Sequence, residues 1–258
     1  MTAKFIGLVT VRTSSTRLPQ KTLLPIGNRR VIDHVIDRAK LITGLDGLAV
    51  CTSDRPEDDI LEKIAEEQKV LCYRGSLEDK LMRFQGAADR FGADYLLLID
   101  ADDLFFDPVV NLLALQQMTE EPCDILKSPD GLVPGAFAFL IGVPALKQVC
   151  VMKDTTDTEM YETYFLETGR FSVRDMVIKD EILFNDRVRL TLDYQEDLDF
   201  FRQVFEGMKM GGNNVSLHDI MQWLTTRPEI VATNLFRHKD YLAKREVMRL
   251  NIKIKNKD

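Results

Sequence analysis

The chain has 258 residues, of which 45% are hydrophobic and 29% are charged, as is typical of a globular protein that buries a sizeable core. Its formal net charge of −7 excludes a general nucleic-acid-binding protein, because binding to phosphate backbones requires a basic surface. No stretch reaches the roughly 18 apolar residues of a membrane span, and the N-terminal apolar run is too short for a signal peptide, so we expect a cytoplasmic protein.

The first hundred residues alternate between short apolar runs and helical patterns. Strands are expected in four of these runs: Phe5–Val11, Leu48–Thr52, Val70–Tyr73 and Tyr95–Ile99. Between them, apolar residues at helical spacing predict helices around 31–39, from Pro56 to about 65, and around 81–91. Continuous apolar strands that alternate with helices predict an α/β fold with a mostly parallel sheet covered on both faces.

The pattern changes after about residue 120. Strands are expected at Ala136–Ile141 and at Val188–Leu192, the second of which leads into an acidic turn. The remaining expected features are a helix around 198–208, a helix capped by Ser216, a break at Pro228 and a last helix from about Lys239 to Leu250. We expect one domain over residues 1–258, with an inserted segment at about 128–186.

A basic loop follows the first expected strand. Arg12, Arg17 and Lys21 alternate there with the hydroxyl side chains of Ser14, Ser15 and Thr16. Ligands of doubly wound sheets bind at the carboxyl ends of the strands, and arginine, lysine and hydroxyl groups bind phosphate oxygens. The loop lacks the glycines of a dinucleotide-binding or P-loop motif. It therefore predicts a different polyphosphate site, and the alternative is a solvated basic loop.

Acidic residues follow two of the expected strands. Asp100, Asp102 and Asp103 end the fourth strand, and Asp193 ends the strand at Val188–Leu192. Carboxylate oxygens beside phosphates are the ligands that Mg²⁺ prefers. The alternative for Asp193 is a turn residue or the N-cap of the helix that follows it.

Several motifs occur in a fixed order along residues 5–205. They are Arg12-x-x-Ser15-Thr16-Arg17-Leu18-Pro19-x-Lys21, Thr52-Ser53-Asp54, Arg74-Gly75-Ser76-x-x-Asp79, Asp102-Asp103-x-x-x-Asp107-Pro108, Pro129-Asp130-Gly131-Leu132 and Arg189-Leu190-Thr191-Leu192-Asp193. Together they resemble the CMP-sugar cytidylyltransferases, which include the CMP-Kdo and CMP-acylneuraminate synthetases. The similarity is greatest to the spore-coat polysaccharide cytidylyltransferase branch.

This resemblance implies a Rossmann-like nucleotidyltransferase fold, similar to that of GT-A glycosyltransferases, with a small inserted segment for dimerisation and acceptor binding. It implies that CMP is transferred from CTP to an acceptor hydroxyl with release of pyrophosphate, for surface glycan synthesis. Mg²⁺ is the implied cofactor, with Asp102 and Asp193 as its ligands, and Arg12 and Lys21 complete the implied catalytic group. The implied nucleotide-binding residues are Arg12, Ser15, Thr16, Arg17, Lys21, Ser53, Arg74, Gly75, Ser76 and Asp79.

The acceptor region departs from the family pattern, because Met160 stands where relatives have a histidine. The expected acceptor is a sugar acid or a related sugar or polyol, phosphorylated ones included, while the usual nonulosonic and octulosonic acids are expected to be poor substrates. Arg170 and Arg174 are candidates to meet a negative charge on the acceptor, or else solvated surface residues. His218 and His238 are expected far from the motifs, and His34 is expected to pack or cap within its helix.

A homodimer is implied by the resemblance, with the inserted segment at its interface. The apolar residues that could form this interface, or instead fill the core of the domain, are Phe137, Phe139, Leu140, Ile141, Tyr161, Tyr164 and Phe165.

Two other functions fit part of the pattern. Asp100-Ala101-Asp102 is also the metal-binding motif of GT-A glycosyltransferases, which consume nucleotide sugars, but that function does not explain the triphosphate-type basic loop. The second is a non-catalytic nucleotide-binding relic, which would have no physical reason to keep acids opposite bases. Release of pyrophosphate from CTP separates the three.

Overall fold

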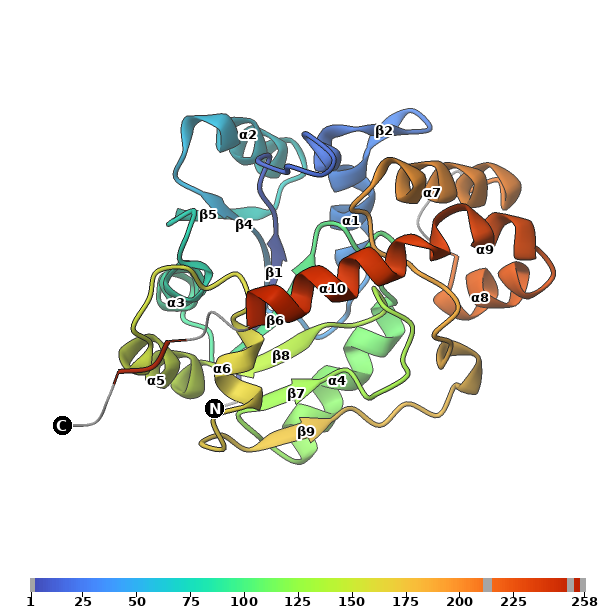
Figure 1. The fold of residues 1–258 in the computed structure, drawn as a ribbon. Coiled ribbons are helices and arrows are strands. Elements are labelled where there is room, and N and C mark those ends of the chain that lie inside the picture. The colour runs from blue at the N-terminus through green and yellow to red at the C-terminus, as the bar shows by residue number, and fades with distance from the viewer. Residues whose placement is uncertain (1–2, 211–214, 250–252, 256–258) are drawn as a thin grey trace.

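The structure, a computed structural model, describes residues 3–210, 215–249 and 253–255. Its centre is a seven-stranded sheet with the strand order β5-β4-β1-β6-β8-β7-β9 (Figure 1). The strands are β1 (Phe5–Thr10), β4 (Gly47–Ser53), β5 (Leu71–Gly75), β6 (Tyr95–Asp100), β7 (Ile125–Lys127), β8 (Phe139–Gly142) and β9 (Val173–Asp175). A separate two-stranded hairpin consists of β2 (Pro25–Ile26) and β3 (Arg29–Arg30).

Most neighbouring strands of the sheet are parallel, as the sequence predicts. β5, β4, β1 and β6 all run in one direction, and β8 is antiparallel to both β6 and β7. Thr10 at the end of β1 is in register with Asp100 at the end of β6. The loops after these two strands therefore leave the sheet side by side.

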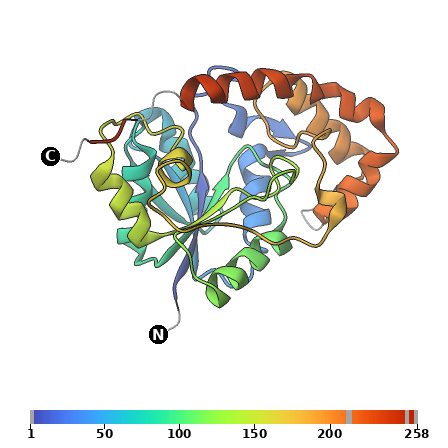
Figure 2. The ribbon, with the colours of Figure 1, turned by 60° about the horizontal axis from the view of Figure 1, so that its bottom comes forward.

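Helices cover both faces of the sheet (Figure 2). Val9 of β1 belongs to a core formed with α1, α2, α4, α7 and α8, whereas Leu8 belongs to a core formed with α3, α5 and α6. This alternation follows from the two-residue period of a strand. The helices are α1 (Val31–Ala39), α2 (Asp59–Glu67), α3 (Lys80–Phe91), α4 (Pro108–Glu120), α5 (Val143–Met152), α6 (Glu162–Leu166), α7 (Gln195–Gly207), α8 (Leu217–Thr225), α9 (Pro228–Leu235) and α10 (Arg237–Arg249).

Capping residues set the starts of several helices. Asp107 accepts hydrogen bonds from the N–H groups of Val109 and Val110, and Pro108 occupies the first turn of α4. Ser216 caps α8 as predicted. His34 packs within α1, where its Nε2 lies 3.0 Å from the carbonyl oxygen of Ile26, so the packing prediction for this histidine is confirmed.

Two sequence predictions are corrected, and a third is confirmed. The described residues 188–192 form no strand, because the N–H groups of Leu190 and Leu192 bond to Pro134 and Asp102, which lie in two different loops. The break predicted at Pro228 is confirmed, since α8 ends at Thr225 and Pro228 begins α9, where a missing N–H costs nothing. The strand expected from Ala136 begins only at β8. The end predicted for the last helix, Leu250, lies outside the described residues.

Residues 253–255 lie beside the end of α5, far from α9 (Figure 1). In Figures 1 and 2, α10 runs from α9 past the carboxyl ends of the central strands toward α5. Beyond it, the N–H group of Lys255 bonds to the carbonyl oxygen of Met152, and the N–H group of Asp154 bonds to that of Lys253. Residues on both sides of α10 are thus fixed to different parts of the fold.

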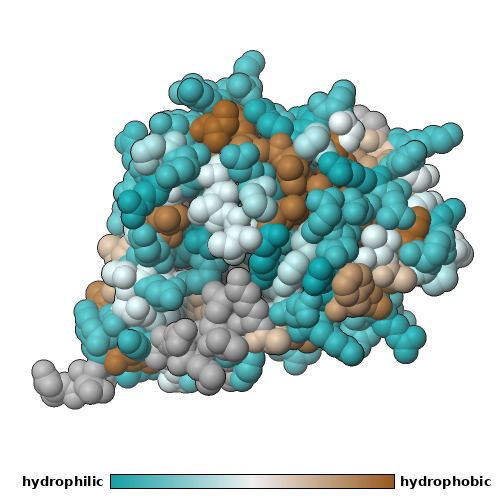
Figure 3. All heavy atoms as spheres, turned by 45° about the horizontal axis from the view of Figure 1, so that its top comes forward, coloured by the Kyte–Doolittle hydropathy of each residue, from teal (hydrophilic) through white to brown (hydrophobic). Residues whose placement is uncertain are grey.

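The face of the molecule in Figure 3 is largely polar and carries hydrophobic groups only in separate small areas. None of the helices in the described ranges combines the length and the apolar character needed to cross a bilayer. Phe137, Leu140, Ile141, Tyr161, Tyr164 and Phe165 are buried in the core of the domain. These residues are therefore not available as a dimer interface, and the alternative, that they fill the core, is correct.

Candidate functional site

A cleft of about 780 Å³ opens at the carboxyl ends of β1 and β6. The loop after β1 forms one side of it and the loop after β6 forms its floor, as the parallel topology requires. The rest of its lining comes from Lys80 and Arg83 of α3, from residues of the segments 127–139 and 159–166, from Asp186, Thr191 and Asp193, and from α10. Segments that are far apart in the sequence therefore meet at a single site.

Lys21 lies at the centre of the cleft. Its Nζ atom is 2.5 Å from Asp102 Oδ2, 3.0 Å from Asp193 Oδ1 and 2.7 Å from the carbonyl oxygen of Leu192. Burial alone would lower the pKa of the ammonium, but the attraction of the two carboxylates outweighs it and raises that pKa above its ordinary value. One cation therefore already bridges the two acids predicted as metal ligands.

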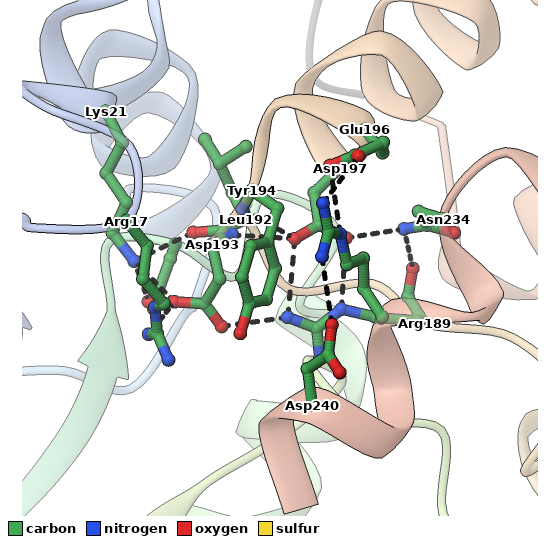
Figure 4. A network of polar contacts seen from close by, with 12 residues as sticks. Arg17, Lys21, Arg189, Leu192, Asp193, Tyr194, Glu196, Asp197, Asn234 and Asp240 are labelled. Atoms are coloured by element: carbon green, nitrogen blue, oxygen red, sulfur yellow. Dashed lines mark hydrogen bonds and ion pairs between the residues drawn. The ribbon is translucent and has the colours of Figure 1, made fainter. Parts of the chain in front are cut away.

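Asp193 is almost fully buried and binds basic groups on two sides (Figure 4). Its Oδ1 atom pairs with Arg17 and Lys21, and its Oδ2 atom accepts a hydrogen bond of 2.8 Å from Arg189. Burial would raise the pKa of Asp193, but these cations hold it below its ordinary value. Asp193 is not the N-cap of α7, because Tyr194 holds that position, and the carboxylate of Asp197 in the first turn accepts hydrogen bonds from the N–H groups of Asp193 and Tyr194.

Three further acids lie together at the end of β6. Oxygen atoms of Asp100, Asp102 and Asp103 are all within 4.8 Å of one another. Burial, with the nearby negative charges of Asp102 and Asp100, raises the pKa of Asp103 well above its ordinary value. Burial also raises the pKa of Asp100, which accepts a hydrogen bond of 2.5 Å from the hydroxyl of Thr10. Since like charges this close repel, the group is suited to a bound cation.

A second ion-pair group lies in the same cleft around Glu159. This carboxylate is 3.3 Å from Arg12 and 3.4 Å from Lys80. Burial would raise the pKa of Glu159, but Lys80 and Arg12 lower it. Lys80 and Arg83 also line the cleft, and our sequence analysis missed both. Their position, directly after the Asp79 motif and three residues apart on α3, is the pattern that could have identified them.

The predicted nucleotide-binding residues fall into two groups. Arg12, Ser15, Thr16, Arg17 and Lys21 line the cleft together. The other five, all in the described part of the chain, lie outside its lining, and their assignment stays a prediction: Ser53, Arg74, Gly75, Ser76 and Asp79.

Those five residues have structural contacts of their own. The hydroxyl of Ser53 donates to the buried carboxylate of Asp58. Arg74 pairs with acids of α2, and the hydroxyl of Ser76 accepts a hydrogen bond from the N–H group of Asp79. Asp79 caps α3 and lies 2.5 Å from the ammonium of Lys153.

The candidate acceptor residues are also separated. Met160 lines the cleft, whereas Arg174 pairs with Glu121 beside α4. His218 lies at an exposed position, 2.8 Å from Asp180. The prediction that His238 lies far from the motifs is wrong, because α10 brings it into the cleft lining. The mainly charged sequence of this helix gives no indication of that position.

Known proteins share this sequence and architecture. A sequence profile described as "Cytidylyltransferase" matches residues 6–209. The spore coat polysaccharide biosynthesis protein SpsF of Bacillus subtilis is 25% identical over 232 residues, which cover 86% of this chain and 94% of SpsF.

Two solved structures show the same fold. One is a cytidylyltransferase from Leptospira borgpetersenii, with a TM-score of 0.79, 19% identity and coverage of 90% of this chain and 97% of that one. The other is a CMP:2-keto-3-deoxy-manno-octonic acid synthetase complexed with CTP, with a TM-score of 0.62, 15% identity and coverage of 80% and 100%. The predicted fold class and the predicted family resemblance are both confirmed.

Proposed function

The chain belongs to the cytidylyltransferase family, and we propose that it transfers CMP from CTP to a hydroxyl of a sugar acid, or of a related sugar or polyol. Pyrophosphate leaves, and the activated sugar serves surface glycan synthesis. One observation carries the proposal: Lys21 joins the acid at the end of β6 to Asp193, inside a cleft that also holds Arg12 and Arg17. The CTP complex of a structural relative and the function named for SpsF support it.

The residues of the basic loop would hold the triphosphate. Arg17 and Lys21 supply positive charge beside Asp193, and Arg12 supplies it beside Glu159. As the acceptor oxygen attacks the α-phosphorus, negative charge grows on the phosphate oxygens and on the leaving pyrophosphate. Fixed cations in a largely buried cleft stabilise that charge without having to reorganise.

Mg²⁺ is the proposed cofactor, and the residues present fit it. Asp102 and Asp193 offer hard oxygen ligands, and the Lys21 ammonium that pairs with both supports a cation site between them. When bound, Mg²⁺ would offset phosphate charge and lower the pKa of the acceptor hydroxyl. Lys21, released from the two carboxylates, would then be available to the triphosphate.

Pyrophosphate release tests the proposal. Each of the four ribonucleoside triphosphates is incubated with the protein, MgCl₂ and a panel of sugar acids, neutral sugars, amino sugars and phosphorylated polyols. We expect release with CTP and at least one acceptor, and poor turnover of Kdo, N-acetylneuraminate and pseudaminate because Met160 lacks an imidazole. A glycosyltransferase would require a preformed nucleotide sugar, and a relic would release nothing, so either result would reject the proposed function.

We also propose that the protein acts as a homodimer in the cytoplasm. The interface must then use surface groups other than the buried apolar residues named above.

A further inference from the structure

Helix α10 covers part of the cleft and is fixed at both ends. At its start, Arg237 pairs with Glu196 of α7 at 2.7 Å, and Asn234 just before it bonds to Asp197 and to the carbonyl oxygen of Arg189. Beyond its other end, residues 253–255 pair with residues 152–154. The helix lies outside residues 6–209, which match the family profile.

Three side chains of α10 line the cleft: His238, Tyr241 and Leu242. The Nδ1 atom of His238 is buried and has no hydrogen-bond partner among the described residues. Leu242 lines the cleft and is 51% exposed, so it offers apolar surface to a ligand. On this side the cleft therefore has an apolar side chain, an aromatic ring and an imidazole with unused hydrogen-bonding capacity, all of which can contact a ligand.

The two oxygen atoms of Asp193 show which part of a substrate this wall would contact. Oδ1 binds Arg17 and Lys21, the cations of the basic loop, whereas Oδ2 binds Arg189 (Figure 4). The guanidinium of Arg189 lies 4.9 Å from the centre of the Tyr241 ring. Helix α10 is therefore on the Oδ2 side, and the groups suited to phosphates are on the Oδ1 side.

We propose that α10 forms the acceptor-binding wall of the cleft, that His238 positions the acceptor through a hydrogen bond to one of its hydroxyl groups, and that Tyr241 and Leu242 pack against its carbon skeleton. The inference rests on the proposed function and adds the location and the character of the acceptor subsite. An imidazole both donates to and accepts from hydroxyl groups, and the apolar face of a sugar ring packs on aromatic and aliphatic side chains.

The charges near this wall indicate which end of an acceptor it binds. Asp186 lines the cleft and its negative charge acts on His238, whereas Asp193 is already paired with three cations. Burial and the positive charge of Arg189 lower the pKa of His238, so the ring is neutral at pH 7. A neutral imidazole suits a hydroxyl-bearing, uncharged part of the acceptor.

Steady-state kinetics test the inference. The acceptor that gives the fastest pyrophosphate release with the parent protein is titrated against His238→Leu, His238→Gln and Leu242→Ser. We expect His238→Leu to raise the KM for the acceptor at least tenfold, and His238→Gln to raise it less, because an amide keeps a donor and an acceptor. The Kd of CTP, measured by calorimetry without acceptor, should stay within about twofold of the parent value.

Matched controls separate this role from general damage to the fold. His218→Leu removes an exposed histidine that pairs with Asp180 outside the cleft, and Val151→Ser removes an exposed apolar side chain from α5. Both should leave the KM for the acceptor unchanged. If His238→Leu does not fold, Leu242→Ser decides, since that exposed position tolerates a smaller residue and should still raise the KM for the acceptor severalfold.

Two results would overturn the inference. One is a parental KM for the acceptor in the His238 and Leu242 variants of an active enzyme, and the other is a weakened CTP Kd with the KM for the acceptor unchanged. Either would leave the proposed function intact. If the parent protein binds CTP but releases no pyrophosphate with any acceptor, the proposed function fails, and the acceptor wall fails with it.

Discussion

Asp197 connects the fold to the site, and its replacement by asparagine should damage both. Its Oδ1 accepts hydrogen bonds from Arg189 Nε and Asn234 Nδ2 at 3.0 and 2.9 Å. Its Oδ2 accepts from the backbone N–H groups of Asp193 and Tyr194 at 2.8 and 2.9 Å. Whichever oxygen becomes an NH₂ group in Asp197→Asn, a donor then faces at least two other donors.

The expected loss of stability follows from burial. The side chains of Asp197 and Arg189 are both fully buried, and Asp193 is the other carboxylate paired with Arg189. Removing one partner of a buried ion pair costs about 3–5 kcal/mol, and because Asp193 still pairs with Arg189 we expect about 3 kcal/mol. For a protein of this size that corresponds to a fall in Tm of roughly 6–12 °C.

Chemical denaturation and calorimetric CTP titration measure the two effects. The matched control is Asp199→Asn on the same helix, which removes the same charge from a side chain that is 48% exposed. It should change the free energy of unfolding by less than about 0.5 kcal/mol. At temperatures well below its Tm, Asp197→Asn should also bind CTP more weakly than the parent, because the side chain at position 197 no longer holds the backbone N–H group of Asp193. Equal effects of the two substitutions would refute the reasoning.

Four other predictions concern nucleotide, metal, pH and assembly. CTP with Mg²⁺ at a hundredfold excess over Kd should stabilise the fold by about 2.7 kcal/mol, and a thermal shift that survives both Arg12→Ala and Lys21→Ala would show that the basic loop is not the phosphate site. Asp102→Asn and Asp193→Asn should each abolish activity. Only Asp193→Asn should also lower the Tm, because this substitution leaves three cations without their shared carboxylate. Parental turnover of either variant would show that the substituted residue is not a metal ligand. Burial would raise the pKa of Asp58, but hydrogen bonds from hydroxyl and backbone groups of the first loop and β4 lower it. The loss of stability in Asp58→Asn should therefore be full at pH 7 and should shrink when chemical denaturation is repeated below about pH 4. A loss of stability that does not depend on pH would contradict this prediction. Light scattering should give twice the 29.5 kDa mass of one chain, and a value near 29.5 kDa at micromolar concentration would reject the homodimer.

The strands of the parallel half of the sheet were predictable because each is a continuous apolar run between polar turns. Helices α4 and α5 were not identified, since apolar residues occur around most of their circumference and give no clear one-sided pattern. The alternating residues 188–192 have a strand-like pattern, but their N–H groups bond to loops. A local sequence pattern does not specify which partner a backbone group will find.

The site was predictable where one loop carries several functional groups, and less so elsewhere. Arg12, Arg17 and Lys21 are close in sequence and line one cleft. Arg74 belongs to a motif of the same resemblance, yet its side chain turns to acids of α2, and sequence spacing does not give that direction. His238 is more than 200 residues from the basic loop, and only the path of α10 brings it near.

The distance between Asp102 and Asp193, the two proposed metal ligands, is set by the main chain. The N–H group of Leu192, next to Asp193, bonds to the carbonyl oxygen of Asp102 at 2.8 Å, so the two loops are joined directly behind their carboxylates. Neither the segment 128–186 nor α10 takes part in that bond. Substitutions in the proposed acceptor regions can therefore leave the spacing of the two acids unchanged, so that acceptor specificity can change while the geometry of the acids is kept.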